Sequence, residues 1–197
     1  MKTTLRSLCL TLAGFAALPL TAQTPAPPVT PAERVIPDTA PPPPEAAEMK
    51  KLGFMIGTWK GDSWIAMGPQ RRTSAVTENV QSRQNGRLLL IEGIGKRKAD
   101  RPEDQVVVHD ALGIIFYDAA AKRYAFHAYR EGAFIDSELK PIADRKFEWG
   151  FREPRSGGHI RFTIDLTVPN RWLETGEFTS DEKTFQKFFE MTLTRTP

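Results

Sequence analysis

Residues 145–167, RKFEWGFREPRSGGHIRFTIDLT, contain two stretches in which apolar and polar side chains alternate. The apolar positions are Phe147, Trp149 and Phe151 in the first stretch and Ile160, Phe162, Ile164 and Leu166 in the second. A period of two places such side chains on one face of a β-strand. Because Gly157-Gly158 indicates a turn between the stretches, we predict an antiparallel hairpin with one face toward a core.

Similar alternation and turn signals continue through most of the chain, and no long helical period follows residue 57. Asn85-Gly86 is the clearest hairpin signal, because both residues tolerate the positive φ of a type I′ turn. A short helix is expected near residues 45–54, where Pro44 suits the first turn. The expected strands are 58–67, 72–83, 87–97, 105–110, 112–118, 122–130, 133–140, 145–152, 159–168 with 171–179, and 184–195.

A meander of about ten antiparallel strands has edges that must be protected, and closure into a barrel removes them. We therefore predict an all-β fold: an antiparallel β-barrel of about ten strands with a short N-terminal helix. A sandwich of two sheets is the alternative. The lack of long helical patterns argues against α/β and α+β folds.

The first 22 residues have the organisation of a secretory signal peptide. Lys2 and Arg6 give a basic start, residues 8–20 are mainly Leu and Ala, and Leu20-Thr21-Ala22 ends in a small residue. This apolar run is shorter than the roughly 20 residues that span a bilayer. We expect cleavage near Ala22, no membrane span, and a secreted or periplasmic mature protein.

Residues 23–44 contain nine of the 16 prolines, which predicts a disordered, extended linker before a domain at residues 45–197. The single cysteine, Cys9, lies in the signal peptide, so the mature chain has no disulfide, Cys-ligated metal or cysteine nucleophile. Without Lys2 and Arg6 the 27 basic residues become 25, against 24 acidic ones. With no basic stripe in addition, we expect no nucleic-acid partner.

The segment LGFMIGTWKG, Leu52 to Gly61, resembles the opening of the lipocalin-like (calycin) β-barrels, in which a short helix leads into Gly-x-Trp on the first strand. The ending Met191 to Arg195 is similar to their last strand, which often carries a basic residue over that Trp. Residues 113–124 resemble a hairpin of secreted bacterial members of uncharacterised function. The resemblance covers residues 50–196, and it implies a barrel that binds a small molecule in its interior.

Trp59 and Arg195 are expected to close the barrel. A guanidinium over an indole face is a cation–π contact worth about 0.5–2 kcal/mol. Such a contact joins the first strand to the last, so we interpret both residues as structural.

Candidate ligand-binding residues come from the faces of individual strands. Arg123, His127 and Tyr129 share one face of residues 122–130, and apolar or aromatic residues take the other. Either face can be the inner one. If the polar-tipped face is inside, these three side chains could orient a ligand.

Glu78 and Glu92 pose the same question, because each shares a face with apolar neighbours. An inward glutamate would need a partner, and Arg123 is a candidate. Trp149 and Phe162 are candidates for an aromatic ligand wall, with core packing as the alternative.

The sequence contains no HExxH, GxSxG, P-loop or GxGxxG motif, so we name no catalytic or metal-binding residue. A related barrel type binds heme through a histidine, but no heme-ligating motif matches, and no cofactor is expected. Three functions remain open. The favoured one is binding of a small, mostly apolar molecule inside the barrel. The alternatives are an envelope structural or adaptor domain without a ligand, and a barrel enzyme of isomerase or cyclase type that uses interior His, Glu or Tyr.

Overall fold

The structure, a computed structural model, describes residues 43–97 and 105–197. The expected signal peptide, nearly all of the expected linker and residues 98–104 lie outside the described residues. Pro44, the last residue of the expected linker, is the first residue of a helix.

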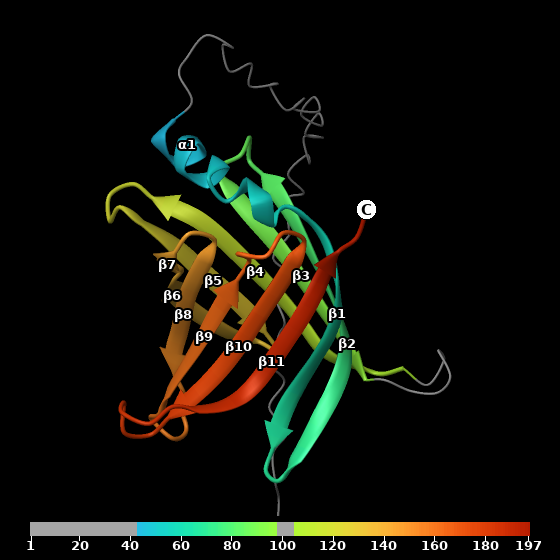
Figure 1. Ribbon diagram of the computed structural model, residues 1–197. Helices are drawn as coiled ribbons and strands as arrows, with labels where there is room; N and C mark the ends of the chain where they lie inside the picture. The colour runs from blue at the N-terminus through green and yellow to red at the C-terminus, as the bar shows by residue number, and fades with distance from the viewer. Residues whose placement is uncertain (1–42, 98–104) are drawn as a thin grey trace, which may run out of the picture. The chain divides into compact units, whose positions relative to one another are not determined.

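The described residues form two short helical segments and eleven β-strands in a single antiparallel sheet (Figure 1). The α-helix α1 spans Pro44–Lys50, and the 3₁₀ helix η1 spans Gly53–Met55. The strands are β1 (Gly57–Met67), β2 (Gln70–Arg83), β3 (Leu88–Arg97), β4 (Val107–Asp118), β5 (Arg123–Arg130), β6 (Ala133–Glu138), β7 (Lys140–Ala143), β8 (Lys146–Arg152), β9 (His159–Asp165), β10 (Arg171–Thr179) and β11 (Gln186–Arg195).

The strand order is β6-β5-β4-β3-β2-β1-β11-β10-β9-β8-β7, so every pair of neighbours is consecutive in the chain except β1 and β11. At the seam between the two ends of the sheet, Ser137 of β6 donates its hydroxyl hydrogen to the carbonyl oxygen of Gly150 of β8 (2.9 Å). The same hydroxyl oxygen accepts the N–H of Gly150 (3.2 Å). The sheet is therefore a nearly closed barrel. The predicted all-β barrel is confirmed, and the two-sheet alternative is wrong because all eleven strands belong to one sheet.

The strand boundaries differ from the prediction in two places. Residues 107–118 form one strand, β4, where the sequence predicts two, because β4 keeps an unbroken register with β3 from His109 to Phe116. Residues 133–140 divide into β6 and β7 at Leu139. This side chain is fully buried, and its N–H makes the last bond of the β5–β6 register, to the carbonyl oxygen of Tyr124 (2.9 Å). From Lys140 onward the chain pairs with β8 instead.

The hairpin predicted at Asn85-Gly86 is present, and both residues have positive φ (55° and 81°). Its loop spans four residues, 84–87, rather than two. A two-residue turn with both residues at positive φ occurs instead at Glu131-Gly132 (51° and 77°), between β5 and β6. That turn has the backbone signature of a type I′ hairpin.

One end of the barrel is covered by α1 and η1, and Figure 1 shows α1 lying across it. Met49, Leu52 and Met55 are buried there and pack in the same core as Trp59 and Leu193. The indole N–H of Trp59 donates to the carbonyl oxygen of Met55 (2.8 Å). We call this the helix-covered end, and the opposite end of the barrel the open end.

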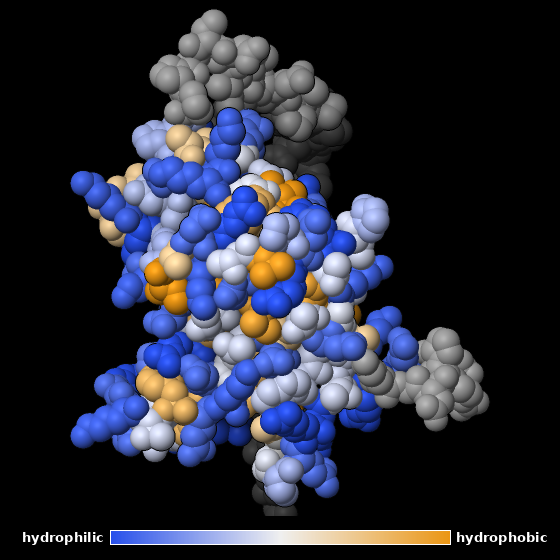
Figure 2. Space-filling model, viewed as in Figure 1, coloured by the Kyte–Doolittle hydropathy of each residue, from blue (hydrophilic) through white to orange (hydrophobic). Residues whose placement is uncertain are grey.

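The outer surface seen in Figure 2 is mainly hydrophilic, with small separate hydrophobic areas. This follows from the alternation along each strand, which turns polar side chains away from the core. Within residues 43–97 and 105–197, no helix is long and apolar enough to cross a membrane.

Candidate functional site

The barrel interior is lined by alternate residues of each strand. On β2 the inward residues Val76, Glu78 and Val80 are buried, and their neighbours in sequence are more exposed. On β10 the inward set includes Trp172 and Glu174. The interior is filled by buried side chains at the helix-covered end. Toward the open end it is lined by half-buried aromatic rings.

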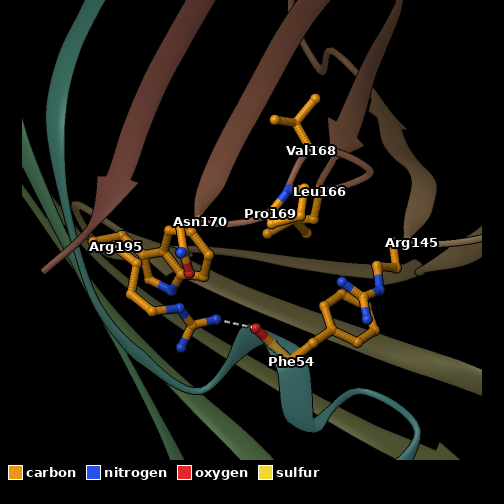
Figure 3. A pocket seen from close by; sticks show the side chains of 8 residues that line it. Phe54, Arg145, Leu166, Val168, Pro169, Asn170 and Arg195 are labelled. Atoms are coloured by element: carbon orange, nitrogen blue, oxygen red, sulfur yellow. Dashed lines mark hydrogen bonds between the residues drawn. The ribbon is translucent and has the colours of Figure 1, made fainter. Parts of the chain in front are cut away.

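At the helix-covered end, the guanidinium carbon of Arg195 lies 4.2 Å from the ring centroid of Trp59. The guanidinium also donates hydrogen bonds to the carbonyl oxygens of Phe54 and Ile56 (the Phe54 bond is drawn in Figure 3). The contact expected from the sequence is therefore present, and it joins β1, β11 and η1. A small pocket of about 90 Å³ beside it is lined by Phe54, Trp59, Arg145, Leu166, Val168, Pro169, Asn170 and Arg195.

A cluster of aromatic rings faces the interior beyond this packed end. Trp149 stacks on Phe162 with ring centroids 4.3 Å apart and planes inclined by 12°. Phe126 meets Trp149 edge-on at 4.8 Å. Phe188 and Phe189 both contact Phe162 at 5.9 Å, because the register between β10 and β11 skips one residue at this point.

Trp149, Phe162 and Phe189 are only half-buried, although they face inward. An inward ring that still touches water must border space connected to solvent. The rings at the helix-covered end are buried by contrast, with Trp59 1% and Trp172 2% exposed. Of the aromatic residues singled out from the sequence, Trp149 and Phe162 thus lie together on an accessible part of the interior wall.

Two carboxyl groups lie in the same interior. Glu78 and Glu174 are each only 8% exposed. Trp149 donates its indole N–H to Oε1 of Glu174 at 3.2 Å. Among the described residues, no hydrogen bond to the carboxyl of Glu78 is found, and burial and the charge of Glu174 are what act on its pKa. It lies against Gly93 of β3, where a Cβ would stand 2.7 and 2.8 Å from its two oxygens, so the glycine makes room for it.

Burial raises the pKa of both carboxyls. The pKa of Glu78 rises to about 8, chiefly because burial removes its hydration and also because the charge of Glu174 acts on it. Burial raises the pKa of Glu174 to about 7, and the indole N–H groups of Trp149 and Trp172 act in the opposite direction. Near pH 7, therefore, both carboxyls hold protons that an exposed glutamate would have lost.

These two acids have no basic partner within residues 43–97 and 105–197. The buried polar or charged side chains of the described chain are Ser63, Glu78, Glu174 and Thr179. The N–H of Trp172 is near enough to favour ionised Glu174, yet its buried nitrogen has no acceptor in hydrogen-bonding geometry among the described residues. Buried charges without partners are costly, and carboxyls with strongly shifted pKa values are concentrated at functional sites.

Arg123, His127 and Tyr129 lie on the outer side of the barrel. The other face of β5, which carries Phe126, is the buried one. His127 Nε2 lies 3.3 Å from Oδ1 of Asp136 on β6, and Tyr129 is 41% exposed. The hypothesis that this polar-tipped face lines the interior is wrong, because the opposite face has more apolar surface to bury.

Glu92 also faces outward. Its carboxylate accepts hydrogen bonds from the side-chain amides of Asn79 (3.3 Å) and Gln81 (3.1 Å) on β2. Of the two glutamates singled out from the sequence, only Glu78 is inside. Arg123 is outside and does not neutralise it.

Some interior polar residues were not predicted. Glu174 shares the inner face of β10 with Trp172, and this parity is the sequence signal that could have identified it. Ser63 and Ser74 share a hydrogen bond of 2.9 Å between β1 and β2 on their inner faces, in segments without a clear alternation. In the part of the chain that the structure describes, no group of three His, Cys, Asp or Glu residues could hold a metal ion.

The fold and this interior fit a lipocalin-like barrel. No protein-family model matches the chain, and neither does any curated protein. Among solved structures, the chain is similar to Rv2717c from M. tuberculosis, with a TM-score of 0.55 and 10% identity over 76% of this chain and 97% of that one. It is also similar to the S-type phycobiliprotein lyase CPES from Guillardia theta, with a TM-score of 0.51 and 11% identity over 79% of this chain and 99% of that one. At these identities the likeness concerns the fold alone.

Proposed function

We propose that this protein binds a small, mostly apolar molecule in the part of the barrel interior that faces the open end. The observation that carries the proposal is the half-buried state of the inward rings of Trp149, Phe162 and Phe189. Small-molecule sites typically combine an apolar wall with a few polar groups that set the orientation. Glu78 and Glu174 are such groups. The likeness to a phycobiliprotein lyase is compatible with a small ligand in a barrel of this kind.

A direct test is titration of the purified full-length protein with N-phenyl-1-naphthylamine, a neutral dye that fluoresces in apolar surroundings. We expect saturable binding, and an organic extract of the same protein should contain a co-purified small molecule. Trp149→Leu should weaken dye binding by about tenfold, since it removes the ring stacked on Phe162.

The matched control is Trp64→Leu. Trp64 is also half-buried, but it lies on the outer side of β1 under the guanidinium of Arg71, 3.9 Å from the ring centroid. This variant should bind the dye like the wild type. Absence of both saturable binding and a co-purified molecule would overturn the proposal and favour an adaptor domain without a ligand. The enzyme hypothesis is not carried further in the form that uses His127, because that side chain is outside.

The proposal includes action after export. It is supported by the basic start, apolar run and small-residue ending of residues 1–22. N-terminal sequencing of the protein recovered from expressing bacteria should find a chain that begins at Gln23. A mature chain that still begins at Met1 would contradict export by this signal.

A further inference from the structure

Glu78 and Glu174 enter the interior from different parts of the wall, since β1 and β11 lie between β2 and β10 in the sheet. They are nevertheless related through two indole rings: Trp59 lies beside Glu78 in the β1–β2 ladder and meets Trp172 edge-on at 5.7 Å. Trp172 is two residues from Glu174 on the same face of β10, and the charge of Glu174 acts on Glu78. The two carboxyls therefore influence the same region of the interior. A charged group of a ligand placed in this region would interact with both carboxyls.

The strands around these carboxyls contribute no countercharge. In the ladders, Glu78 lies between Trp59 and Gly93, and Glu174 lies between Met191 and Ile164. None of these four neighbours is titratable. Within the described strands, neither glutamate forms an ion pair.

Toward the open end, β4 carries a titratable side chain, His109. It lies opposite Gly95, two residues beyond Gly93, and its imidazole is half-buried. Burial lowers the pKa of His109, with the charge of Arg130 acting in the same sense, so the ring is neutral at neutral pH. It therefore provides no positive charge for the two acids.

The remaining polar features also suit a positive group. The Glu78 carboxyl accepts no hydrogen bond from the described residues, so its oxygens can accept hydrogen bonds from a ligand. The indole N–H of Trp149 donates to Glu174 and so places an aromatic ring beside this carboxyl. Aromatic rings attract cations to their faces. An anionic group would add a further negative charge to this region, and a neutral one would leave the acids unpaired.

We propose that the molecule bound in the barrel is an organic cation: an apolar or aromatic compound whose protonated amine or amidine nitrogen donates hydrogen bonds to Glu78 and Glu174. The inference rests on the proposed function and names the chemical class of its ligand. The cation supplies the charge that the protein itself lacks at this place. Aromatic side chains of the open half hold the apolar part.

The experiment compares three probes of nearly equal size that differ in charge: 2-phenylethylamine, 2-phenylethanol and 3-phenylpropionate. Their affinities for the full-length protein are measured by calorimetry and by displacement of N-phenyl-1-naphthylamine. We expect the amine to bind at least about tenfold more tightly than the alcohol, and the carboxylate to bind most weakly. Calorimetry in two buffers of different ionisation enthalpy should show release of about one proton as the amine binds near pH 7, because the carboxyls lose their protons to form the ion pairs.

Variants assign this preference to the two carboxyls. Glu78→Gln and Glu174→Gln should each reduce the advantage of the amine over the alcohol to about threefold or less. Glu92→Gln makes the same change on the outer side of the neighbouring strand and should keep the wild-type preference. Circular dichroism checks that each variant is folded, and if one is not, the wild-type probe series still decides the question.

Equal or tighter binding of the alcohol would overturn the cation inference and leave the proposed function standing. A preference for the amine that survives in both folded glutamine variants would overturn the assignment to Glu78 and Glu174. Failure of the dye and all three probes to bind would remove the proposed function and the inference together.

Discussion

Replacing Glu78 by glutamine should make the protein more stable at and above neutral pH. The pKa of this buried carboxyl is raised from 4.5 to about 8, first by burial and then by Glu174. Between about pH 4.5 and about pH 8, the carboxyl of Glu78 keeps its proton in the folded state and has lost it in the unfolded chain. Stability contributed by the neutral carboxyl is therefore fully present below about pH 4.5 and is lost as the pH rises toward about 8. Glutamine stays neutral at every pH, so the variant does not lose this stability.

The size of the effect follows from the difference between the pKa of Glu78 in the folded protein and in the unfolded chain. A pKa that differs by 1 between the two states corresponds to about 1.4 kcal/mol of stability. From about pH 5 to about pH 8, the stability of Glu78→Gln should gain on the order of 3 kcal/mol relative to the wild type. For a domain of this size, that corresponds to roughly 10 °C in Tm.

The assay is urea unfolding of both proteins, followed by tryptophan fluorescence at several pH values from about 5 to about 9. Glu92→Gln serves as the control, because the same substitution on the outer side of β3 should change the free energy of unfolding by less than about 0.5 kcal/mol at every pH. A constant difference between wild type and Glu78→Gln across the pH range would refute the reasoning. So would a wild type that is the more stable protein at pH 8.

Three further predictions concern the fold itself. Trp59→Ala should lower the free energy of unfolding by about 3–5 kcal/mol, because Trp59 is buried beneath Arg195, and unchanged thermal unfolding would contradict this. Gly93→Ala should destabilise by about 1–3 kcal/mol, since its methyl group would meet the oxygens of Glu78. In a double-mutant cycle, Glu78→Ala should remove most of that penalty, and additive effects would rule out the contact. Ser137→Ala should cost about 1–3 kcal/mol in urea unfolding, because it removes both hydrogen bonds to Gly150 across the seam, and no loss would show that the seam does not depend on them.

Much of the fold could be predicted from the sequence, because alternation with a period of two is a local property. It predicted the strands around Trp149 and Phe162, and the length of the meander predicted closure. Errors arose where tertiary contacts redefine a boundary. β6 ends after Leu139 because the chain pairs with β8 from Lys140 onward, and no residue near Leu139 indicates this change of partner.

The candidate site was predictable only in part. Glu78, Trp149 and Phe162 are inside, whereas Arg123, His127, Tyr129 and Glu92 are outside. Parity shows which side chains share a face, but both faces of such strands contain residues that could be buried. Which of the two faces is buried depends on the side toward which the rest of the sheet curves to form the barrel.

The sequence by itself thus determined that the chain forms antiparallel strands and which side chains lie together on each strand. The contact of Trp59 with Arg195 was implied by the resemblance of the chain's first and last strands to those of lipocalin-like barrels. Only the tertiary structure decided which face is enclosed and which residues from distant strands share the interior. Glu78 and Glu174 illustrate the difference. Each belongs to an ordinary alternating strand, and closure of the barrel removes both from water and brings their charges within reach of each other. The physical reason is that alternation is set by backbone geometry within one strand, whereas burial and electrostatic coupling depend on every strand that surrounds the same space.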